Sequence, residues 1–292
     1  MGPGNQEKPL VKDNVAAQVI NGQQIAKSIR NHIRLQVKKL DFKPGLAVIQ
    51  IGTDSASTVY VNHKKKDCER VGFHSKVTRL PSNTSQEEVI DLVKQLNRSN
   101  SIHGILVQMP MPSHINEQMV IDSILPQKDA DGLGTVNLGN LLIGREHILP
   151  CTPGGILRLI EKTKVKLVGK RVVCVGRSRL VGKPIGLLLL NRHATVTFCH
   201  SRTTNLGLET KEADILVVAV GKPKFITEEM VKPGAIVIDV GINRAGDSLI
   251  GDIDFKAVSK VASFITPVPG GVGPMTRAIL LENTLKLATT QS

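Results

Sequence analysis

The sequence predicts an α/β protein of two domains built on parallel sheet. Short runs of β-branched apolar residues alternate along the chain with segments of helical periodicity, a pattern typical of parallel α/β folds. The chain has 292 residues and is 41% hydrophobic, which is enough for two domains with separate cores. The Pro/Gly-bearing segment 150–155 (PCTPGG) is the expected boundary between them.

The first half of the chain shows three strands separated by helices. Ile25, Ile29 and Ile33 recur on one helical face, and Thr84 with Glu87 resembles a capping box that would begin a later helix. The patterns predict helices over 24–40, 55–71, 84–96 and 116–124, and strands over 46–51, 77–80 and 104–107.

The second half predicts a Rossmann-type domain. A helix over 156–163 leads into it, and strands are expected at 172–175, 194–199, 215–219, 235–239 and 263–266. A closing helix is expected over 275–288. We therefore predict an N-terminal substrate domain over 16–154, completed by that helix, and a cofactor domain over 155–274.

The segment 171–190 (RVVCVGRSRLVGKPIGLLLL) reads as strand, glycine-bearing turn and helix. Such a turn directs free backbone N–H groups and a positive helix end at an anion. Gly176 and Gly182 stand too far apart for the strict dinucleotide fingerprint. This stretch alone therefore suits a phosphate site and an ordinary β–α turn equally well.

The end of the next strand favours the phosphate site. NAD sites usually carry an acidic residue there, which holds the ribose 2′-hydroxyl. In this chain His200-Ser201-Arg202-Thr203 supplies hydroxyls and an arginine, and Arg177 lies in the preceding turn. The guanidinium fork suits a 2′-phosphate, so these residues favour NADP over NAD.

Composition limits the class of protein. The chain carries 38 basic and 25 acidic residues, a net charge of +13, which invites a nucleic-acid hypothesis. It has no Trp and one Tyr, which leaves few platforms for stacking bases, and anionic small molecules explain the charge equally well. We expect neither nucleic acid nor a membrane as partner.

The cysteines and the N-terminus suggest a location. Four cysteines are scattered without metal-ligand spacing, so we expect buried thiols in a reducing cytoplasm and no metal. The polar N-terminal segment lacks the apolar stretch of a signal peptide and is expected to be mobile.

Several polar residues could carry chemistry, and each has a plainer interpretation. Tyr60 and Lys64 share a helical face, although His63-Lys64-Lys65-Lys66 resembles a solvated run of charge. Gln108 follows a strand, where ligands bind in α/β sheets, or is only a polar boundary. Asp129 and Asp131 stand in a glycine-bearing loop and could instead form its turns.

Together these stretches carry a resemblance. YVNHK, GILVQMP, KDADG, PCTPGG, GRSRLVGKP, DVGIN and ITPVPGGVGPMT occur in this order between Gln18 and Ala288. They resemble the bifunctional methylenetetrahydrofolate dehydrogenase/cyclohydrolase family of the FolD type. The resemblance implies a homodimer, joined through the NADP domains, with folate bound in the cleft between the two domains of each subunit. It also implies NADP-dependent oxidation of 5,10-methylenetetrahydrofolate and hydrolysis of the product to 10-formyltetrahydrofolate.

The resemblance implies roles for single residues. Lys64 matches the lysine needed for hydrolysis, and Gln108 matches the glutamine bonded to it. Tyr60 matches the tyrosine beside the aminobenzoyl ring, and Asp131 the aspartate that grips the pterin. Together with Arg202, the expected cofactor contacts are Gly176, Arg177, Ser178, Ser201 and Ile242. The remaining substrate contacts would be Val107, Met109, Pro269, Gly270, Gly271, Val272, Gly273, Pro274 and Thr276.

Two departures and three alternatives accompany this hypothesis. Arg277 stands where a small apolar residue is expected, and would meet the folate glutamate tail or solvent. Leu133-Gly134 replaces an aromatic-bearing variant of the loop. The alternatives are a dehydrogenase with weak or lost hydrolysis, a non-catalytic basic binding protein, and another NADP dehydrogenase of the quinate or shikimate type.

Overall fold

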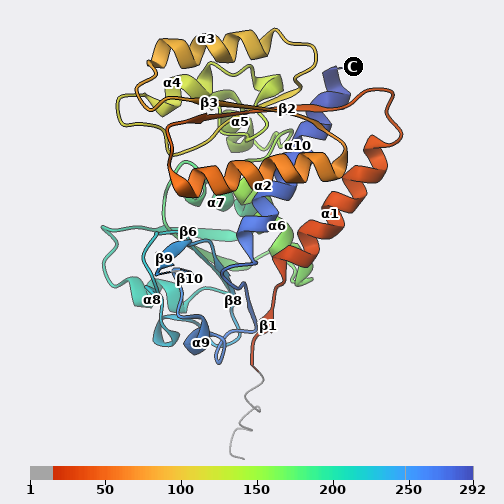
Figure 1. Cartoon of the computed structure of the whole chain (residues 1–292). Coiled ribbons are helices and arrows are strands. Elements are labelled where there is room, and N and C mark those ends of the chain that lie inside the picture. The colour runs from red at the N-terminus through yellow and green to blue at the C-terminus, as the bar shows by residue number, and fades with distance from the viewer. Residues whose placement is uncertain (1–15, 247, 292) are drawn as a thin grey trace, which may run out of the picture.

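The computed structural model describes residues 16–246 and 248–291, and Figure 1 shows how its elements are arranged. The N-terminal segment that we expected to be mobile lies outside these residues. In the described part of the chain the strands form two parallel sheets and one short hairpin. The smaller sheet lies at the top of the view in Figure 1 and the larger one below it.

The larger sheet has six strands, and every pairing within it is parallel. From edge to edge it consists of β1 (Gln18–Val19), β11 (Phe264–Ile265), β8 (Ile236–Asp239), β7 (Ile215–Val218), β5 (Arg171–Val175) and β6 (Thr195–Cys199). The two central strands β7 and β8 are buried along their whole length, as their continuous apolar sequences predict. The hairpin of β9 (Asn243–Ala245) and β10 (Ser248–Ile250) follows β8.

The smaller sheet has three parallel strands with β2 in the centre. Its strands are β3 (His74–Leu80), β2 (Gly45–Ile51) and β4 (Gly104–Val107). All seven residues of β2 are buried, which fits its apolar sequence GLAVIQI. The carboxyl ends of β2 and β4 therefore lie side by side.

Helices cover both sheets. They are α1 (Gly22–Val37), α2 (Ser55–Val71), α3 (Gln86–Asn97), α4 (Glu117–Asp122), α5 (Thr135–Leu142), α6 (Cys151–Lys162), α7 (Gly182–Leu190), α8 (Leu206–Lys211), α9 (Phe255–Val258) and α10 (Val272–Gln291), with short 3₁₀ helices at Pro126–Lys128 and Glu228–Met230. The long helix α10 packs against α1 and α6 and reaches β4, so it connects the two halves of the molecule. In the described residues no helix is long and apolar enough to cross a membrane.

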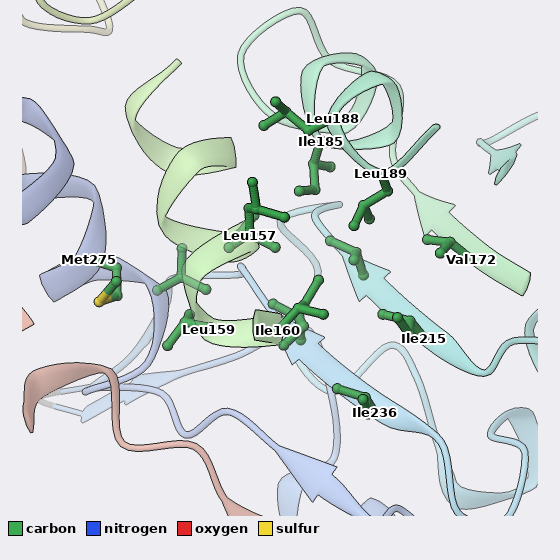
Figure 2. Packing of buried hydrophobic residues seen from close by; sticks show 14 of the residues in the cluster. Leu157, Leu159, Ile160, Val172, Ile185, Leu188, Leu189, Ile215, Ile236 and Met275 are labelled. Atoms are coloured by element: carbon green, nitrogen blue, oxygen red, sulfur yellow. The ribbon is translucent and has the colours of Figure 1, made fainter. Parts of the chain in front are cut away.

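Figure 2 shows how α6 and α7 pack on the larger sheet. Side chains of both helices, including Ile160 and Leu188, meet Ile215 and Ile236 from the central strands, and all belong to one buried cluster. Burial of each such side chain contributes about 1.5–3 kcal/mol relative to exposure. This packing fixes the N-terminal end of α7 beside the end of β5, where the anion-binding turn is predicted.

The structure corrects two details. Ser85 and Glu88 form the capping box of α3, with Glu88 accepting from the Ser85 N–H at 2.8 Å, so the predicted pair Thr84 and Glu87 is one residue early. The helix predicted over 156–163 is observed as α6 over Cys151–Lys162, so it begins five residues earlier than predicted and includes both glycines of the PCTPGG segment. Both Gly154 and Gly155 lie against α10: an added Cβ would approach Ile279 to 3.2 Å and Met275 to 2.9 Å, respectively.

Candidate functional site

Helix α2 carries the central charged residue of the site. The Asp54 carboxylate caps the helix by accepting from the Ser57 N–H at 2.7 Å, and Gly72 ends it with a φ of 89°. Lys64 is only 8% exposed, whereas the next two residues of the helix, Lys65 and Lys66, are exposed. The interpretation of this segment as a solvent-exposed run of charge therefore holds for Lys65 and Lys66 and is wrong for Lys64.

Gln108 holds the amine of Lys64 in place. The Lys64 Nζ donates a hydrogen bond to Gln108 Oε1 at 2.8 Å, and Gln108 Nε2 donates to the backbone oxygen of Met109 at 2.7 Å. The second bond orients the amide, so that its oxygen faces the lysine. Gln108 follows β4 directly, and its own N–H bonds Ile49 in β2. A polar residue at this strand end thus meets a buried amine from α2.

Burial is the main cause that lowers the pKa of Lys64 below its usual value, and the positive charge of Arg277 lowers it further. The negative charge of Asp131 acts in the opposite direction. A lowered pKa increases the neutral fraction of the amine at a given pH, and only the neutral amine can accept a proton. The site can therefore place a base at the wall of a cavity.

A cavity of about 410 Å³ adjoins this amine, which is within the range of small-molecule sites. Many of the residues predicted to contact substrate line it: Tyr60, Lys64, Val107, Gln108, Met109, Asp131, Val272, Gly273 and Thr276, together with Ile242. They come from α2, the end of β4, the loop before α5 and the start of α10. The structure thus brings together residues that are more than 200 positions apart in the sequence.

The loop before α5 separates the roles of its two carboxylates. Asp129 is 1% exposed and accepts from the N–H groups of Gly132 and Gly134 at 2.9 and 2.8 Å and from Asn137 Nδ2 at 2.9 Å. Asp129 therefore forms the turn. Asp131 is free of that task and lines the cavity.

The predicted loop 269–274 lines a second cavity of about 320 Å³, which adjoins the first. Its lining includes Pro269, Gly270, Gly271 and Pro274, and both cavities share Tyr60, Val240, Ile242, Val272, Gly273 and Arg277. An added Cβ on Gly271 would lie 2.6 Å from the backbone oxygen of Pro267. Glycine at this position is therefore required by the tight loop itself.

The turn after β5 also requires its glycines. Gly176 has a φ of 119°, and a Cβ there would lie 2.3 Å from the backbone oxygen of Ala219. A Cβ on Gly182 would lie 2.0 Å from the oxygen of Gly176. Ser178 Oγ accepts from the N–H groups of Val181 and Gly182 at 3.2 and 3.4 Å, so it fixes the start of α7.

The remaining predicted cofactor residues lie at the end of β6. Gly176 N–H bonds the oxygen of Cys199 at 2.9 Å, which places the ends of β5 and β6 side by side. Ser201 and Arg202 are exposed just beyond β6, as Arg177 and Ser178 are beyond β5. These residues form an open surface at the carboxyl ends of parallel strands, where nucleotides bind in such sheets.

Sequence reasoning missed Asp67. Its carboxylate is 3% exposed and lies 3.1 Å from Arg277 Nε. The Arg277 side chain is only 17% exposed and lines both cavities. It therefore faces the cavities and is largely shielded from bulk solvent. A signal was available, because Asp67 follows Lys64 by one helical turn and lies on the same face of α2.

Comparisons with known proteins identify the family of this chain. A family model described as "Tetrahydrofolate dehydrogenase/cyclohydrolase, catalytic domain" matches residues 20–131. A second, described as "Tetrahydrofolate dehydrogenase/cyclohydrolase, NAD(P)-binding domain", matches residues 150–292.

Individual relatives match over almost the full chain. The "Bifunctional protein FolD" of Moorella thermoacetica is 52% identical over 276 residues, covering 93% of this chain and 99% of that protein. The FolD crystal structure from Campylobacter jejuni has a TM-score of 0.92 and 43% identity, covering 95% of this chain and 100% of that one. FolD from Trypanosoma brucei, solved with NADP cofactor and inhibitor, has a TM-score of 0.91 and 38% identity, with coverage of 94% and 98%. This chain belongs to the tetrahydrofolate dehydrogenase/cyclohydrolase family.

Proposed function

We propose that the protein oxidises 5,10-methylenetetrahydrofolate with NADP⁺ and then hydrolyses the methenyl product to 10-formyltetrahydrofolate. The observation that carries this proposal is the buried Lys64 amine, held by Gln108 at the wall of a cavity of about 410 Å³. A simple dehydrogenase has no need of a desolvated base at this place. The family membership and the names of the bifunctional relatives support both reactions.

In this proposal the substrate spans the first cavity and extends into the second. Asp131 accepts two adjacent N–H donors of the pterin, which suits a carboxylate. Tyr60 packs beside the aminobenzoyl ring at the junction of the two cavities. Val107, Met109, Val272, Gly273 and Thr276 line the first cavity and would contact the substrate there.

The cofactor would lie along the ends of β5 and β6. Gly176 keeps the turn close to the sheet, as its tight approach to Ala219 requires, and leaves room for a dinucleotide backbone. Arg177 and Arg202 would hold the 2′-phosphate with their guanidinium forks, and Ser178 and Ser201 would bond phosphate oxygens. Ile242 lines both cavities and would place the nicotinamide against the folate. NADP⁺ supplies the hydride acceptor, and the protein aligns the two rings.

Hydrolysis needs a proton acceptor near the methenyl carbon. Water adds to that carbon, the C–N bond on one side breaks, and one proton is released. Neutral Lys64 would accept the proton from the water, and Gln108 would keep the amine aimed at the cavity. The buried setting lowers the pKa of Lys64 and so favours the neutral form that this step needs.

The test is to mix the purified protein with 5,10-methylenetetrahydrofolate and NADP⁺ and to follow NADPH and methenyltetrahydrofolate absorbance together. Formation of NADPH without build-up of the methenyl compound is the expected result. Accumulation of as much methenyl compound as NADPH would show that the protein lacks hydrolase activity. No reaction with either NADP⁺ or NAD⁺ would overturn the proposal.

We also propose a homodimer through the larger sheet. β6 is an edge strand of the larger sheet, and its Thr195, Thr197 and Phe198 are exposed. An exposed strand edge suits pairing with a second copy. The variant Thr195→Lys/Thr197→Lys should sediment as a monomer and the wild-type protein as a dimer. A wild-type monomer would refute this interface.

The predicted domain division and location remain proposals. The two sheets support a substrate domain of residues 16–154 with 275–288 and a cofactor domain of 155–274, although β1 pairs with β11 in the larger sheet. Cys68, Cys151, Cys174 and Cys199 are free and buried, which supports a reducing cytoplasm. Fractionation of cells that produce the untagged protein would test the location.

A further inference from the structure

The turn between β5 and α7 makes contacts with both halves of the molecule. Arg177 and Ser178, which are expected to contact the cofactor, are exposed. Farther along the turn, Leu180 packs against the buried cluster of the smaller-sheet half and lines the first cavity together with Val181. Arg179 stands between these two pairs. The turn that would hold the dinucleotide therefore also forms part of the wall of the substrate cavity.

The guanidinium of Arg179 reaches from this turn to α4 in the smaller-sheet half. Its Nη2 atom lies 2.8 Å from Glu117 Oε2, and its Nη1 atom donates a hydrogen bond to Gln118 Oε1. The side chains of Arg179 and Glu117 are 35% and 34% exposed, so water screens the pair only in part. Glu117 and Gln118 are the first two residues of α4, so the guanidinium fork binds the start of this helix at two adjacent points.

Glu117 connects this contact to the segment that follows Gln108. Its other carboxylate oxygen, Oε1, accepts a hydrogen bond from the Met111 N–H at 3.3 Å. Met111 is buried and lies three residues after Gln108, where the chain leaves β4. One oxygen of the carboxylate thus binds Arg179 and the other binds the chain beyond β4. A displacement of Glu117 would therefore move the segment that places Gln108 beside Lys64.

Gln118 connects the same guanidinium to the loop that carries Asp131. Its Nε2 atom donates to Asp122 Oδ1 at 3.0 Å and to Thr135 Oγ1 at 3.3 Å. Asp122 in turn accepts from the N–H and the hydroxyl of Thr135 at 2.8 and 2.9 Å. Thr135 is the first residue of α5 and lies four residues after Asp131. A continuous chain of hydrogen bonds therefore joins the cofactor turn to the loop of the cavity carboxylate.

We propose that Arg179 is a positioning residue that couples the binding of NADP⁺ to the binding of folate. This inference rests on the proposed function, because it takes the cofactor at Arg177 and Ser178 and the pterin at Asp131 as given. A dinucleotide that fixes the turn also fixes the Arg179 guanidinium and, through α4, the segments of Gln108 and Asp131. Folate fixes the same contacts from the other side, so each ligand increases the affinity for the other by the same factor.

The test measures the dissociation constant of NADP⁺ by calorimetry, alone and with saturating tetrahydrofolate, which lacks the one-carbon unit and gives no turnover. In the wild-type protein tetrahydrofolate should lower this constant about fivefold, the contribution expected of a partly exposed ion pair. In Arg179→Met the factor should fall to about one, whereas the constant for NADP⁺ alone should change less than about twofold. Arg179→Lys keeps the charge opposite Glu117 but not the fork, so its factor should be intermediate.

Arg192→Met is the matched control. Arg192 lies just after α7, the helix that begins at the same turn, and its Nη2 atom lies 2.9 Å from Glu146 Oε2. This ion pair also joins the two halves, and its side chains are 28% and 21% exposed, but neither residue lines the first or the second cavity. Arg192→Met should therefore keep the wild-type coupling factor.

Three results would overturn the role of Arg179 while both ligands still bind. They are a factor of one in the wild-type protein, an unchanged factor in Arg179→Met, and an equal loss in Arg179→Met and Arg192→Met. Failure of NADP⁺ or of tetrahydrofolate to bind on its own would instead refute the proposed function.

Discussion

The two halves of the molecule build their sites by different means. In the smaller-sheet half the site depends on buried charged side chains: Lys64, Asp67 and Arg277 are at most 17% exposed. In the larger-sheet half the site depends on backbone shape. The turn after β5 is so tight that a Cβ on Gly176 or Gly182 would collide with backbone atoms. The charged side chains of that half, Arg177 and Arg202, are exposed.

This difference has a chemical meaning. Proton transfer needs a base whose pKa departs from its value in water, and burial in a low-dielectric site supplies the shift. Hydride transfer belongs to the cofactor, so the protein has only to bind and align it. We therefore expect the two reactions to fail separately when one half or the other is altered.

The largest effect is expected for Lys64→Met. Loss of a general base lowers the rate of its step by about 10²–10⁴, so hydrolysis of added methenyltetrahydrofolate should fall by that factor. NADPH formation should continue, because the cofactor surface is intact. Replacement of a buried amine by an apolar side chain of similar size is often neutral for stability, so Tm should not fall. A loss of hydrolysis below tenfold would remove Lys64 from this role.

The next largest effect is expected for Gly176→Ala. The added Cβ meets the oxygen of Ala219 in a backbone conformation that disfavours alanine, so the free energy of unfolding should fall by about 3 kcal/mol. The KM for NADP⁺ should rise as well, because the turn must move away from the sheet. Chemical denaturation and initial rates would measure the two effects.

Gly169→Ala serves as a control that has the backbone strain of a positive φ without the steric collision expected in Gly176→Ala. Gly169 also has a positive φ, of 74°, but a Cβ there meets nothing within 4 Å. This variant should lose only about 1 kcal/mol and keep its KM for NADP⁺. Equal losses in both variants would show that the close approach to Ala219 does not matter.

The same contrast explains what the sequence could reveal. The turn at Gly176 and the helix Ser55–Val71 depend on local signals, namely apolar runs, glycines and caps, and the structure has both. The sequence predicted Thr84 as the cap of α3, but the adjacent Ser85 has the same capping hydroxyl and is the cap in the structure. The start of α6 was predicted after the PCTPGG glycines, because glycines usually mark a loop, but the helix begins at Cys151. Local patterns fix the existence of elements better than their ends.

The charged half depends on contacts between distant residues. Nothing local distinguishes Lys64 from its lysine neighbours, since its burial follows from the packing of α1, β2, β3 and α10 against α2. The prediction for Lys64 came from the family resemblance. The cluster of Asp67 with Arg277 was not found, because its members are 210 residues apart in the chain.

A smaller effect is expected for Arg177→Ala. Loss of one charge-assisted contact to the 2′-phosphate should raise the KM for NADP⁺ about tenfold, with little change in any reaction with NAD⁺. Arg171→Ala is the control, because Arg171 lies at the opposite end of β5 and pairs with Glu212. If NADP⁺ and NAD⁺ were affected equally, the 2′-phosphate assignment would be wrong.

The smallest effect is a shift along the pH axis in Arg277→Gln. Hydrolysis should increase as pH rises through the pKa of Lys64, because the neutral amine is the active form. Burial mainly lowers that pKa and Arg277 lowers it further, so removal of Arg277 should move the inflection to higher pH. Rates at saturating substrate would show it. Lys65→Gln, an exposed neighbour, should leave the inflection in place.

The central claim is that the two halves carry separable reactions, and one measurement tests it directly. NADPH and methenyltetrahydrofolate would be followed together in Lys64→Met and in Gly176→Ala, with saturating 5,10-methylenetetrahydrofolate and NADP⁺ at the wild-type KM. The account predicts that the methenyl compound accumulates in step with NADPH in Lys64→Met, whereas Gly176→Ala forms NADPH slowly and accumulates none. The same ratio of the two products in both variants would contradict it.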